Sequence, residues 1–456
     1  MFWLFLKDGK KMKKTILKFT FIVLAIGIVF ISSVSAATTA CDGSLADCQT
    51  KVNAAADGDM ITIPNGSFRW DSALNVNLSG GRVLTIRGLN TCTLDINGRP
   101  TSCPTSISGT GGFSITGARD KAWRISNMTL NGGIGIAAKG DSRNWRIDHI
   151  YFNAPTGSAL AVNRIIWAQG SGGAQTVSWG LVDHCTVFNS RAIFLHARAN
   201  SSDGGNYEWG LGAELGTANA VYVEDNTFVT PTHNFYGAIL TDCEGASFVI
   251  RKNILGNNVV MNHDAIVNGY RGCKKWEVYN NTFTNVVGTG LWTNFATRGG
   301  AAVAFNNTIT NAPQGHPMEV HLYRSYQAGG NPWDTLCGSS SGKAILDSAT
   351  NYPQNCTSGV GCVYKDGTGT NGYPCRDQLG TQGNGAQTIN PALFWNNKLN
   401  GLFIEPIIRS GAAYYTKSVN YCSNASADKP KTCNGRAVTY TPYIYPHPLT
   451  RPEQHP

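Results

Sequence analysis

A short pattern that occurs four times between residues 221 and 309 decides what this chain can fold into. Each copy is an alternating strand-like run, then an Asn, then a second short apolar run. The four Asn residues are separated by 27, 28 and 26 positions: Asn226, Asn253, Asn281 and Asn307. A third strand-like run follows each of the first three copies, at residues 238–241, 265–268 and 290–293. Three strands in each unit, with no helical period between them, predict one coil of a parallel β-helix per copy.

Residues upstream of the four copies extend the pattern, with three other residues in the Asn slot: Asn127, His149 and His184. Asn suits a bend in the chain because it tolerates left-handed backbone angles. Stacked side-chain amides can also hydrogen-bond to one another from coil to coil. Imidazoles can donate and accept hydrogen bonds in a similar way. We therefore expect this column of residues, the two histidines included, to be scaffold.

The N-terminal residues have the pattern of an export signal. Lysines at positions 13, 14 and 18 precede a mostly apolar run at 19–31, and Val34-Ser35-Ala36 follows that run. This pattern predicts a signal peptide cleaved after Ala36, and hence a secreted, extracellular protein. The apolar run is short for a membrane span, so we expect no span after cleavage.

The signal peptide also accounts for most of the positive charge. Residues 1–36 hold six Lys and one Asp, so their removal lowers the formal net charge from +9 to +4. Lys and Arg do not cluster in the remaining chain, which argues against nucleic acid as a partner. A mildly positive protein is compatible with an acidic polysaccharide as its partner.

Thirteen Cys residues in an exported chain indicate disulfide bonds. Proximity in the sequence favours four pairs and makes a fifth plausible: Cys41–Cys48, Cys92–Cys103, Cys356–Cys362, Cys422–Cys433 and Cys337–Cys375. Cys243 and Cys273 lie near equivalent points of adjacent coils, and Cys185 is left as the odd, buried thiol. No Cys-x-x-Cys run has a His partner, so a zinc site is not expected.

Residues 41–56 place Leu45, Cys48 and Val52 on one apolar face at helical spacing. A helix here would cover the open end of a solenoid, where the core and the strand edges are exposed. This helix, the run Gly58-Asp59-Met-Ile-Thr-Ile-Pro64-x-Gly66 and the Asn column resemble the pectate-lyase-like right-handed β-helix proteins over about residues 41–325. The resemblance implies an all-β fold: a single-stranded right-handed parallel β-helix with an N-terminal capping helix and a disulfide-rich C-terminal cap.

The periodicity divides the chain into a signal peptide at 1–36, a β-helix with its N-terminal cap at 37–326, and a loop-rich, disulfide-pinned C-terminal cap at 327–456. A small carbohydrate-binding module is the alternative for the last region. The longest insertion between coils, residues 200–219, is expected beside a binding face, because long loops on a rigid scaffold often carry function. A loop without function is the alternative.

Side chains alternate inward and outward along a strand, so the third strands can be aligned into columns. The alignment places these residues inward: Ile193, Ile239, Ile266 and Leu291. It places these outward: Phe194, Leu240, Val267 and Trp292; then His196, Asp242, Gly269 and Asn294; then Arg198, Glu244 and Arg271, with Arg298 nearby. Such a band suits a charged sugar polymer, since Arg binds carboxylates through two parallel hydrogen bonds. The alternative is a solvent-facing sheet whose charges neutralise one another.

The family resemblance also implies a chemistry. Uronic-acid polysaccharide lyases of this fold remove the C5 proton, α to a carboxylate, and eliminate the 4-linked sugar, which requires a base and a cation. The predicted catalytic residues are Arg271 as base, Lys274 as the next candidate, Arg298 to neutralise the carboxylate and His263 as a further candidate. The predicted ligands of a Ca²⁺ ion are Asp242 and Glu244. The predicted substrate-binding residues are His196, Arg198, Trp292 and Asn294.

Trp145-Arg-Ile-Asp-His149 and Trp179-Gly-Leu-Val-Asp-His184 resemble the Trp-Ile-Asp-His stretch of pectate lyases, whereas the Arg-x-Pro-Arg-x-Arg segment of that family is absent. The motifs of polygalacturonase-like hydrolases and a Gly-rich phosphate loop are absent too. The sequence therefore favours a secreted, lyase-like enzyme acting on an acidic, uronate-containing glycan. The alternatives are a non-catalytic glycan-binding surface or matrix protein and a purely structural solenoid.

Overall fold

The computed structural model describes residues 36–153, 164–188, 193–200, 202–203, 205–229, 238–241, 245–262, 272–286, 293–312, 316–320, 377, 379–383, 388–409, 415 and 417–451. The predicted signal peptide lies outside these residues except for Ala36. Most of the described chain is β-strand. None of the described helices is long and apolar enough to cross a membrane.

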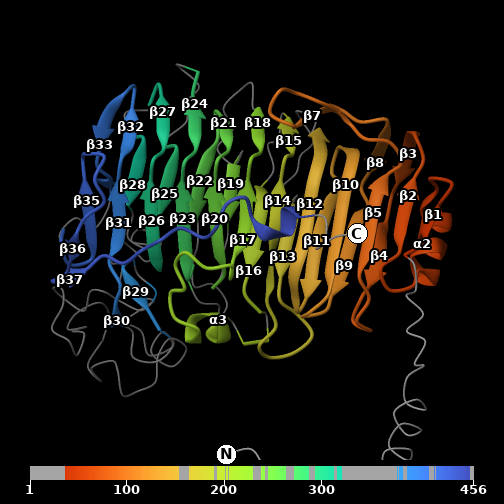
Figure 1. Cartoon of the computed structure of the whole chain (residues 1–456), viewed down its shortest axis with the longest axis horizontal. Helices are drawn as coiled ribbons and strands as arrows, with labels where there is room; N and C mark the ends of the chain where they lie inside the picture. The colour runs from red at the N-terminus through yellow and green to blue at the C-terminus, as the bar shows by residue number, and fades with distance from the viewer. Residues whose placement is uncertain are drawn as a thin grey trace, which may run out of the picture. The chain divides into compact units, whose positions relative to one another are not determined.

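The four copies of the repeat stack as parallel strands, as the sequence predicts (Figure 1). Their first strands are β17 (Val221–Glu224), β20 (Ser247–Arg251), β23 (Lys275–Tyr279) and β26 (Ala301–Phe305). Their second strands are β18 (Thr227–Val229), β21 (Ile254–Gly256), β24 (Thr282–Thr284) and β27 (Thr308–Thr310). Equivalent strands pair in register from coil to coil, which places Val221, Phe248, Trp276 and Ala302 in one buried column.

Earlier and later coils extend this sheet in both directions. The long strands β10 (Ala122–Asn131) and β12 (Ser142–Asn153) run through the bend without a break, and β14 (Ser178–Asp183) with β15 (Thr186–Phe188) follows. The other members are β1 (Thr38–Ala40), β2 (Met60–Ile63), β3 (Gly66–Trp70), β5 (Leu84–Gly88), β8 (Thr105–Gly109), β31 (Ala392–Trp395), β32 (Asn397–Leu399), β33 (Leu402–Ile404) and β35 (Tyr421–Asn424). We call these 21 strands the first sheet.

A second sheet of ten strands is formed by the third strand of each coil, and the apolar core lies between the sheets. In order it contains β4 (Ala73–Asn77), β9 (Gly112–Gly117), β11 (Gly135–Gly140), β13 (Arg164–Gln169), β16 (Ile193–Arg198), β19 (Ala238–Thr241), β22 (Val259–Asn262), β25 (Phe295–Thr297), β28 (Met318–Val320) and β34 (Ile407–Ile408). Small antiparallel pairs join β6 (Thr93–Leu94) to β7 (Pro100–Ser102), β29 (Thr381–Gln382) to β30 (Thr388–Ile389) and β36 (Thr432–Cys433) to β37 (Arg436–Ala437).

The predicted alignment of the third strands is wrong in two respects. β19 coincides with the predicted run 238–241, and the strands that pair next in the sheet are β22 and β25. The predicted run 265–268 and, except for Thr293, the predicted run 290–293 lie outside the described residues. In addition, Ile193 pairs with Ala238 instead of lying level with Ile239. The reason is that the apolar run 259–261 belongs to β22, which is separated from the end of β21 at Gly256 by only two residues. The second-sheet strand of this coil therefore comes earlier in the sequence than the alignment assumes. The predicted columns are therefore displaced.

The Asn column is confirmed as a continuous chain of hydrogen bonds. The amide Nδ2 of Asn226 donates to Oδ1 of Asn253 at 3.1 Å, and that of Asn253 donates to Asn281 at 3.0 Å. Asn281 donates to Asn307 at 3.0 Å, and Asn307 donates to a fifth member, Asn397, at 2.8 Å. All five side chains are buried, so each amide is satisfied inside the protein.

The placement of Asn127 and of the two histidines in this column is wrong by one residue, since Asn127 (φ 57°) also has the left-handed conformation and is level with His149. His149 (φ 51°) and His184 (φ 50°) have the left-handed conformation, as Asp225 (φ 57°) does, one position before the ladder Asn. The pairing of Asp183 with Glu224 sets this register. The ladder position next to Asn226 is held instead by Cys185, whose amide donates to Asn226 Oδ1 at 2.8 Å. The histidines therefore belong to the outer corner of the coils and not to the buried ladder.

Replacing Asn253 with Leu is expected to lower the free energy of unfolding by about 1–3 kcal/mol, because buried donors and acceptors in two neighbouring coils lose their partners. Asn253 joins Asn226 to Asn281 and also donates to the Val223 carbonyl at 2.9 Å. Chemical denaturation measures the change. Asn424→Leu is the control, because Asn424 lies in β35 outside the ladder. Equal stability of N253L and the native protein would contradict the energetic role of the ladder.

The predicted N-terminal helix is present as α2 (Leu45–Ala54) beside β2 and β4 (Figure 1). Ser44 caps its first turn by accepting a hydrogen bond from the Asp47 amide, as is typical of an N-cap. Cys48 and Val52 are its buried residues, so the predicted apolar face packs on the core.

Three predicted disulfides are confirmed: Cys41–Cys48, Cys92–Cys103 and Cys422–Cys433. Cys273 is disulfide-bonded, and its predicted partner Cys243 lies outside the described residues. Cys185 is a free, buried thiol, as predicted. The predicted pairs Cys356–Cys362 and Cys337–Cys375 also lie outside the described residues.

The parallel sheet continues beyond residue 326, where the sequence periodicity ends. β31 pairs in parallel with β26, and β35 pairs in parallel with β31. The predicted boundary at 326 therefore does not coincide with the end of the coils.

A segment close to the C-terminus, Tyr440–Thr450, lies across the outward face of the first sheet, and we call it the strap (Figure 1). It ends in the short helix η3 (Pro448–Thr450). Hydrogen bonds tie it to several coils: Tyr440 to Glu277 (2.7 Å), Arg251 to the carbonyls of Tyr443 and Ile444 (2.7 and 2.9 Å), the His447 amide to Glu224 (2.9 Å) and Arg146 to the Thr450 carbonyl (3.3 Å). A second apolar cluster forms beneath it.

Acidification is expected to loosen the strap. Burial, aided by the charge of Arg251, lowers the pKa of His447 to about 3. A released strap would bind a proton below about pH 6.5, so the docking free energy is complete above that pH and is lost as the pH falls towards 3. Burial raises the pKa of the neighbouring Glu224. The docked strap therefore favours the protonated form of Glu224, which partly offsets the loss of docking free energy at low pH.

Hydrogen exchange of the amides in residues 443–450 at pH 7 and pH 4 measures this effect. We expect exchange at pH 4 to be at least about tenfold faster after correction for the intrinsic rate. In H447Q the pH dependence should diminish, because Gln does not titrate. Exchange in the native strap that is independent of pH would contradict the prediction.

Candidate functional site

The outer corner of the first sheet carries two Asp-His pairs in successive coils. Asp148 ends the first part of β12, Asp183 ends β14, and the two residues are paired in register. A left-handed His follows each Asp, which turns both imidazoles outward from the same corner. The rings stack with their centroids 5.4 Å apart and an interplanar angle of 8°.

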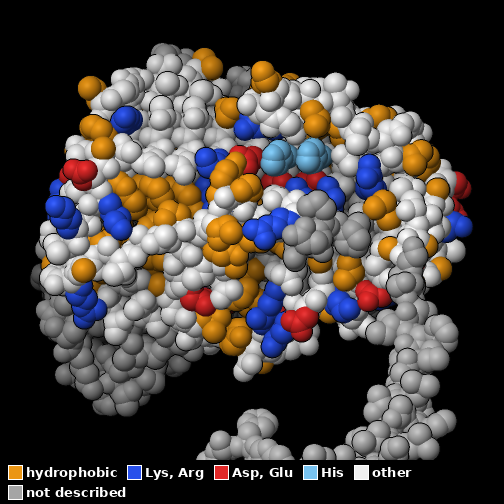
Figure 2. Space-filling view, in the orientation of Figure 1, with side chains coloured by type: hydrophobic (Ala, Val, Ile, Leu, Met, Phe, Trp, Pro, Cys, Tyr) orange, Lys and Arg blue, Asp and Glu red, His pale blue; other side chains and the backbone are white. Residues whose placement is uncertain are grey.

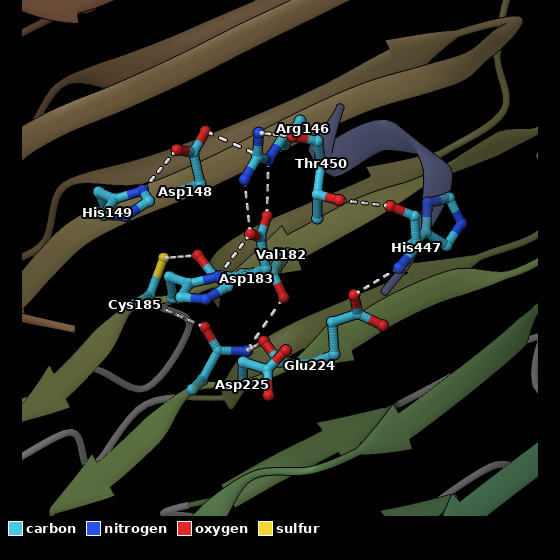
Figure 3. Close-up of polar contacts among 12 residues, drawn as sticks. Arg146, Asp148, His149, Val182, Asp183, Cys185, Glu224, Asp225, His447 and Thr450 are labelled. Carbon is cyan, nitrogen blue, oxygen red and sulfur yellow. Dashed lines mark hydrogen bonds and ion pairs between the residues drawn. The ribbon is translucent and has the colours of Figure 1, made fainter. Parts of the chain in front are cut away.

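Each imidazole is held by the carboxylate before it, and Figure 3 labels one of these pairs, His149 with Asp148. His149 Nδ1 lies 2.6 Å from Asp148 Oδ2, and His184 Nδ1 lies 2.8 Å from Asp183 Oδ2. An ionised carboxylate accepts from Nδ1–H, which leaves Nε2 of each ring as the atom that exchanges protons with a ligand. Among the described residues neither Nε2 atom has a hydrogen-bond partner. The His side chains remain 23% and 30% exposed.

The two carboxylates are completely buried and are paired with arginines of the same sheet. Arg124 donates to both oxygens of Asp148 at 2.6 and 2.7 Å. Arg146 donates to both oxygens of Asp183 at 2.8 and 2.7 Å, and it also lies 3.6 Å from Asp148. Bidentate pairs of this kind fix both distance and orientation. The imidazoles are therefore anchored through their carboxylates to the rigid sheet.

The electrostatics keep these groups in the charge states that acid–base chemistry requires. Burial alone would raise the pKa of Asp183, but the hydrogen bonds and charge of Arg146 together with His184 lower it overall. The pKa of Asp148 is lowered for the same reasons, with His149 and Arg124 opposing burial. The hydrogen bond to Asp183 raises the pKa of His184 above its ordinary value, although burial opposes this. Both carboxylates are thus ionised, and the imidazolium form of His184 is stabilised.

Cationic and aromatic groups border the histidines. Figure 2 shows a pair of His side chains at the surface with acidic and basic side chains beside them. Tyr445 of the strap contacts both oxygens of Asp225 at 3.1 Å, and Lys252 Nζ lies 4.4 Å from the Tyr445 ring centroid. Arg99 Nε donates to the Asp225 carbonyl at 2.8 Å from the hairpin that the Cys92–Cys103 disulfide closes. The strap and this hairpin therefore meet at Asp225, which is level with His184 in the next coil.

Five of the predicted site residues lie outside the described residues: Arg271, His263, Trp292, Asp242 and Glu244. The predicted catalytic residues Lys274 and Arg298 are described, and both are buried. Lys274 Nζ lies 2.6 Å from Glu214 of the 200–219 insertion. The backbone amide of Arg298 donates to Asn262 at 2.5 Å. Neither of these two cations lies at the outer surface.

The 200–219 insertion covers this buried charge. It contains the helix α3 (Asn206–Gly210), whose Trp209 donates to the Gly272 carbonyl at 2.8 Å. Glu208 on the same helix is 1% exposed, and burial raises its pKa to about 8 despite the nearby charge of Lys274. A carboxyl group in this environment is neutral at pH 7, so the insertion packs as an integral part of the fold.

The predicted substrate-binding residues are only partly in the expected column. His196 and Arg198 alternate with the core residues Leu195 and Ala197, so they have the outward parity that the sequence predicts, although His196 is fully buried. Asn294 belongs elsewhere: it precedes β25, is buried, and bonds to Asn285 at 2.9 Å.

The predicted outward aromatic strip also fails at its described first member, Phe194. Its ring is 1% exposed and packs edge-on against Phe152 and Phe228 of the core. Phe194 and its neighbour Leu195 both belong to the core, which simple alternation cannot anticipate.

No group of three or more potential metal ligands occurs within the described residues. Because the predicted Ca²⁺ ligands Asp242 and Glu244 lie outside them, a calcium site remains a prediction.

No protein-family model and no curated protein sequence matches this chain. Among solved structures, the chain is similar to the alginate lyase from Paenibacillus sp. str. FPU-7, with 15% identity over 63% of this chain and 91% of that chain, and a TM-score of 0.35. It is also similar to the PL6 family alginate lyase AlyGC, with 12% identity over 90% of this chain and 59% of that chain, and a TM-score of 0.27.

Proposed function

We propose that the protein is a secreted, lyase-like enzyme that acts on an acidic, uronate-containing polysaccharide, and that its coils form a right-handed parallel β-helix. The observation that carries the enzymatic proposal is the pair of stacked imidazoles, 5.4 Å apart, at the outer corner of the first sheet. Each ring is oriented by a buried carboxylate through Nδ1, which reserves Nε2 for proton transfer.

The pair supplies the two proton transfers that β-elimination needs. One imidazole takes the C5 proton of a uronate, the C–H electrons form the C4–C5 double bond, and the C4–O4 bond breaks. The other imidazole gives its proton to the departing O4. We assign the donor role to His184, because its bond to Asp183 raises its pKa, and the acceptor role to His149. Parallel rings on one corner place both transfers on the same face of a sugar.

A cation must also offset the charge that develops on the uronate carboxylate. Lys252, whose Nζ lies over the Tyr445 ring at the edge of the site, is one described candidate. The sequence-based candidates Arg271 and His263, with Asp242 and Glu244 as residues that would hold a Ca²⁺ ion, would form a rival catalytic centre. Chelation and site-directed variants distinguish the two centres.

A non-catalytic glycan-binding protein is the second candidate function. Lys139 and Arg198 of the second sheet favour it, because they lie in one column with Thr116 and Gln169, and a polar face with cations can bind sugars without an acid–base pair.

The test is a panel of polyuronates and neutral polysaccharides, followed by absorbance of new unsaturated uronyl ends with and without a calcium chelator. We expect unsaturated products from at least one polyuronate and from no neutral polymer. Activity that survives chelation supports the imidazole pair, and activity that chelation abolishes supports the calcium centre. Binding of polyuronates without any product would overturn the enzymatic proposal in favour of the binding protein.

A further inference from the structure

The C-terminal end of the first sheet carries a polar cavity in a different part of the molecule from the His pair. β35 pairs with β31 and lies at the end of the molecule opposite α2 (Figure 1). A cavity of about 530 Å³ is lined by residues 422–424 of this strand, by residues of the loop 425–432 and by Glu405, Lys417 and Ser418. Cavities of this size hold small organic molecules.

The loop that forms one wall of the cavity is fixed at both of its ends and in its middle. The Cys422–Cys433 disulfide joins the strand to the end of the loop. Within the loop the Asp428 amide donates to Ser426 Oγ at 3.3 Å, and the Asn396 amide donates to the Ser426 carbonyl at 2.8 Å. The wall is therefore already in place before a ligand binds, which reduces the entropy lost on binding.

One buried hydroxyl that lines this cavity lacks a hydrogen-bond partner. Ser423 is 5% exposed, and its Oγ makes no hydrogen bond. The residue level with it in the preceding coil is Phe394 of the core, so the hydroxyl lies where an apolar column ends. A buried hydroxyl that stays unpaired is costly, and almost all such groups find a partner. A ligand in the cavity would supply that partner.

The charged groups that line the cavity are mostly cationic. Lys417 is neutralised by Glu405, whose carboxylate oxygens lie 2.7 and 2.8 Å from its Nζ. Lys429 donates only to a backbone carbonyl, at 3.1 Å. Lys431 is exposed and forms no ion pair within the described part of the chain. Two ammonium groups thus remain against the single carboxylate of Asp428, which favours an anionic ligand.

The kind of cation indicates the kind of anion. The described residues that line the cavity include three lysines and no arginine. The planar guanidinium is the group that matches a carboxylate through two parallel hydrogen bonds, whereas a lysine ammonium acts as a point charge and commonly binds phosphate. Hydroxyls of Ser423, Ser426 and Thr432 can donate further hydrogen bonds. This set of donors suits a tetrahedral oxyanion, and the volume leaves room for a polar group attached to it.

We propose that this cavity is a second ligand site, which binds a small polar molecule that carries a phosphate or sulfate ester. The oxyanion would contact Lys431, Lys429 and the Ser423 hydroxyl, and the rest of the molecule would contact the polar loop. The site lies in the last coil of the first sheet, away from the stacked histidines of β12 and β14. This inference therefore goes beyond the proposed function and does not depend on it.

Isothermal titration of the full secreted protein tests the class of ligand. The probes are glucose 6-phosphate and glucose 6-sulfate, with inorganic phosphate as the free oxyanion, glucuronate as a carboxylate of similar size and glucose as the neutral sugar. We expect at least one ester to bind about tenfold more tightly than glucuronate, glucose and inorganic phosphate. The two esters distinguish a phosphate from a sulfate. Absence of binding by both esters, or equal affinity for glucuronate or inorganic phosphate, would overturn the proposal.

Three variants test the assigned contacts. K431A should raise the Kd for the preferred ester about tenfold or more, since a charge-assisted contact is lost. S423A should also raise the Kd, but its thermal unfolding temperature should be equal to or above that of the native protein, because an unpaired buried hydroxyl is removed. K398A is the matched control, since Lys398 is a nearby cation on β32 that does not line the cavity, and it should leave the Kd unchanged.

Native affinity in K431A, or an equal loss of affinity in K398A, would show that Lys431 does not contact the ligand. Loss of stability in S423A with native affinity would make the hydroxyl a structural group. Either result overturns the assigned site. A variant with both His149 and His184 changed to Gln should keep its affinity for the ester, and K431A should keep its turnover of polyuronates. Loss of ester affinity in the His variant would contradict the proposed independence of the two sites.

Discussion

Replacing His184 with Gln is expected to lower kcat on a polyuronate by about 10²–10⁴-fold, which is the usual contribution of a positioned acid or base. Gln can occupy the same corner and accept or donate a hydrogen bond, but it cannot transfer a proton. Because the bond to Asp183 raises the pKa of His184, the native donor is lost as the pH rises through that value. Native kcat should therefore decline on the alkaline side, and H184Q should lack that decline.

His149→Gln should have an effect of similar size, since the reaction needs both transfers. His316→Gln is the matched control: His316 also lies beside a carboxylate, 3.2 Å from Glu319, but away from the stacked pair. Rates are measured from the absorbance of unsaturated ends at saturating substrate across a pH series. If both corner variants retain native kcat while R271A has none, the catalytic centre is the one predicted from the sequence and not the imidazole pair.

Replacing Arg146 with Met is expected to destabilise the protein by about 3–5 kcal/mol, the usual loss when one partner of a buried ion pair is removed. Arg146 lies between two carboxylates that are completely buried, and it gives Asp183 two hydrogen bonds. It also reaches the strap through the Thr450 carbonyl. Without it, Asp183 would be ionised in the interior with only His184 to compensate. Denaturant unfolding followed by fluorescence measures the change.

Arg143→Met provides the comparison on the same strand. Arg143 pairs with Asp141, which also pairs with the half-exposed Arg119 and so keeps a partner, and the loss of Arg143 should therefore cost about 1 kcal/mol or less. A variant that combines Arg146→Met with Asp183→Asn should regain part of the lost stability, because the unpaired charge is gone. Stability of R146M within about 1 kcal/mol of the native protein would show that the buried carboxylates do not depend on this arginine.

The stacked coils were predictable because their signal is local and repeated. A period of about 27 residues and an Asn at each bend require only adjacent coils to pair in register, and the Asn226–Asn253 bond is the direct consequence. The third strands carry weaker signals, since an apolar run of three residues such as 259–261 has several possible partners. Their order in the second sheet depends on loop lengths, which the apolar pattern does not specify.

The corner that carries the two Asp-His pairs was missed because Asp-His and Asp-Asn look alike when aligned on the Asp. The correct alignment follows from the strand after the bend. Thr186 pairs with Thr227, which places Cys185 level with Asn226 and His184 level with Asp225. The strap could not be predicted at all. Its contacts join Arg251 to carbonyls almost 200 positions away, and no local pattern indicates such a pairing.

The Asn ladder has a consequence for how proteins of this kind change in length. Every amide in it donates in the same direction, from Asn226 towards Asn397, so each coil presents one acceptor to the coil before it and one donor to the coil after it. A tandem duplication of the segment 226–252 would therefore meet compatible neighbours on both sides, and the gene could grow by whole coils. In the two histidine coils the ladder positions hold Ile150 and Cys185, which have no side-chain amide. A duplicated coil would therefore not find a matching amide donor and acceptor there.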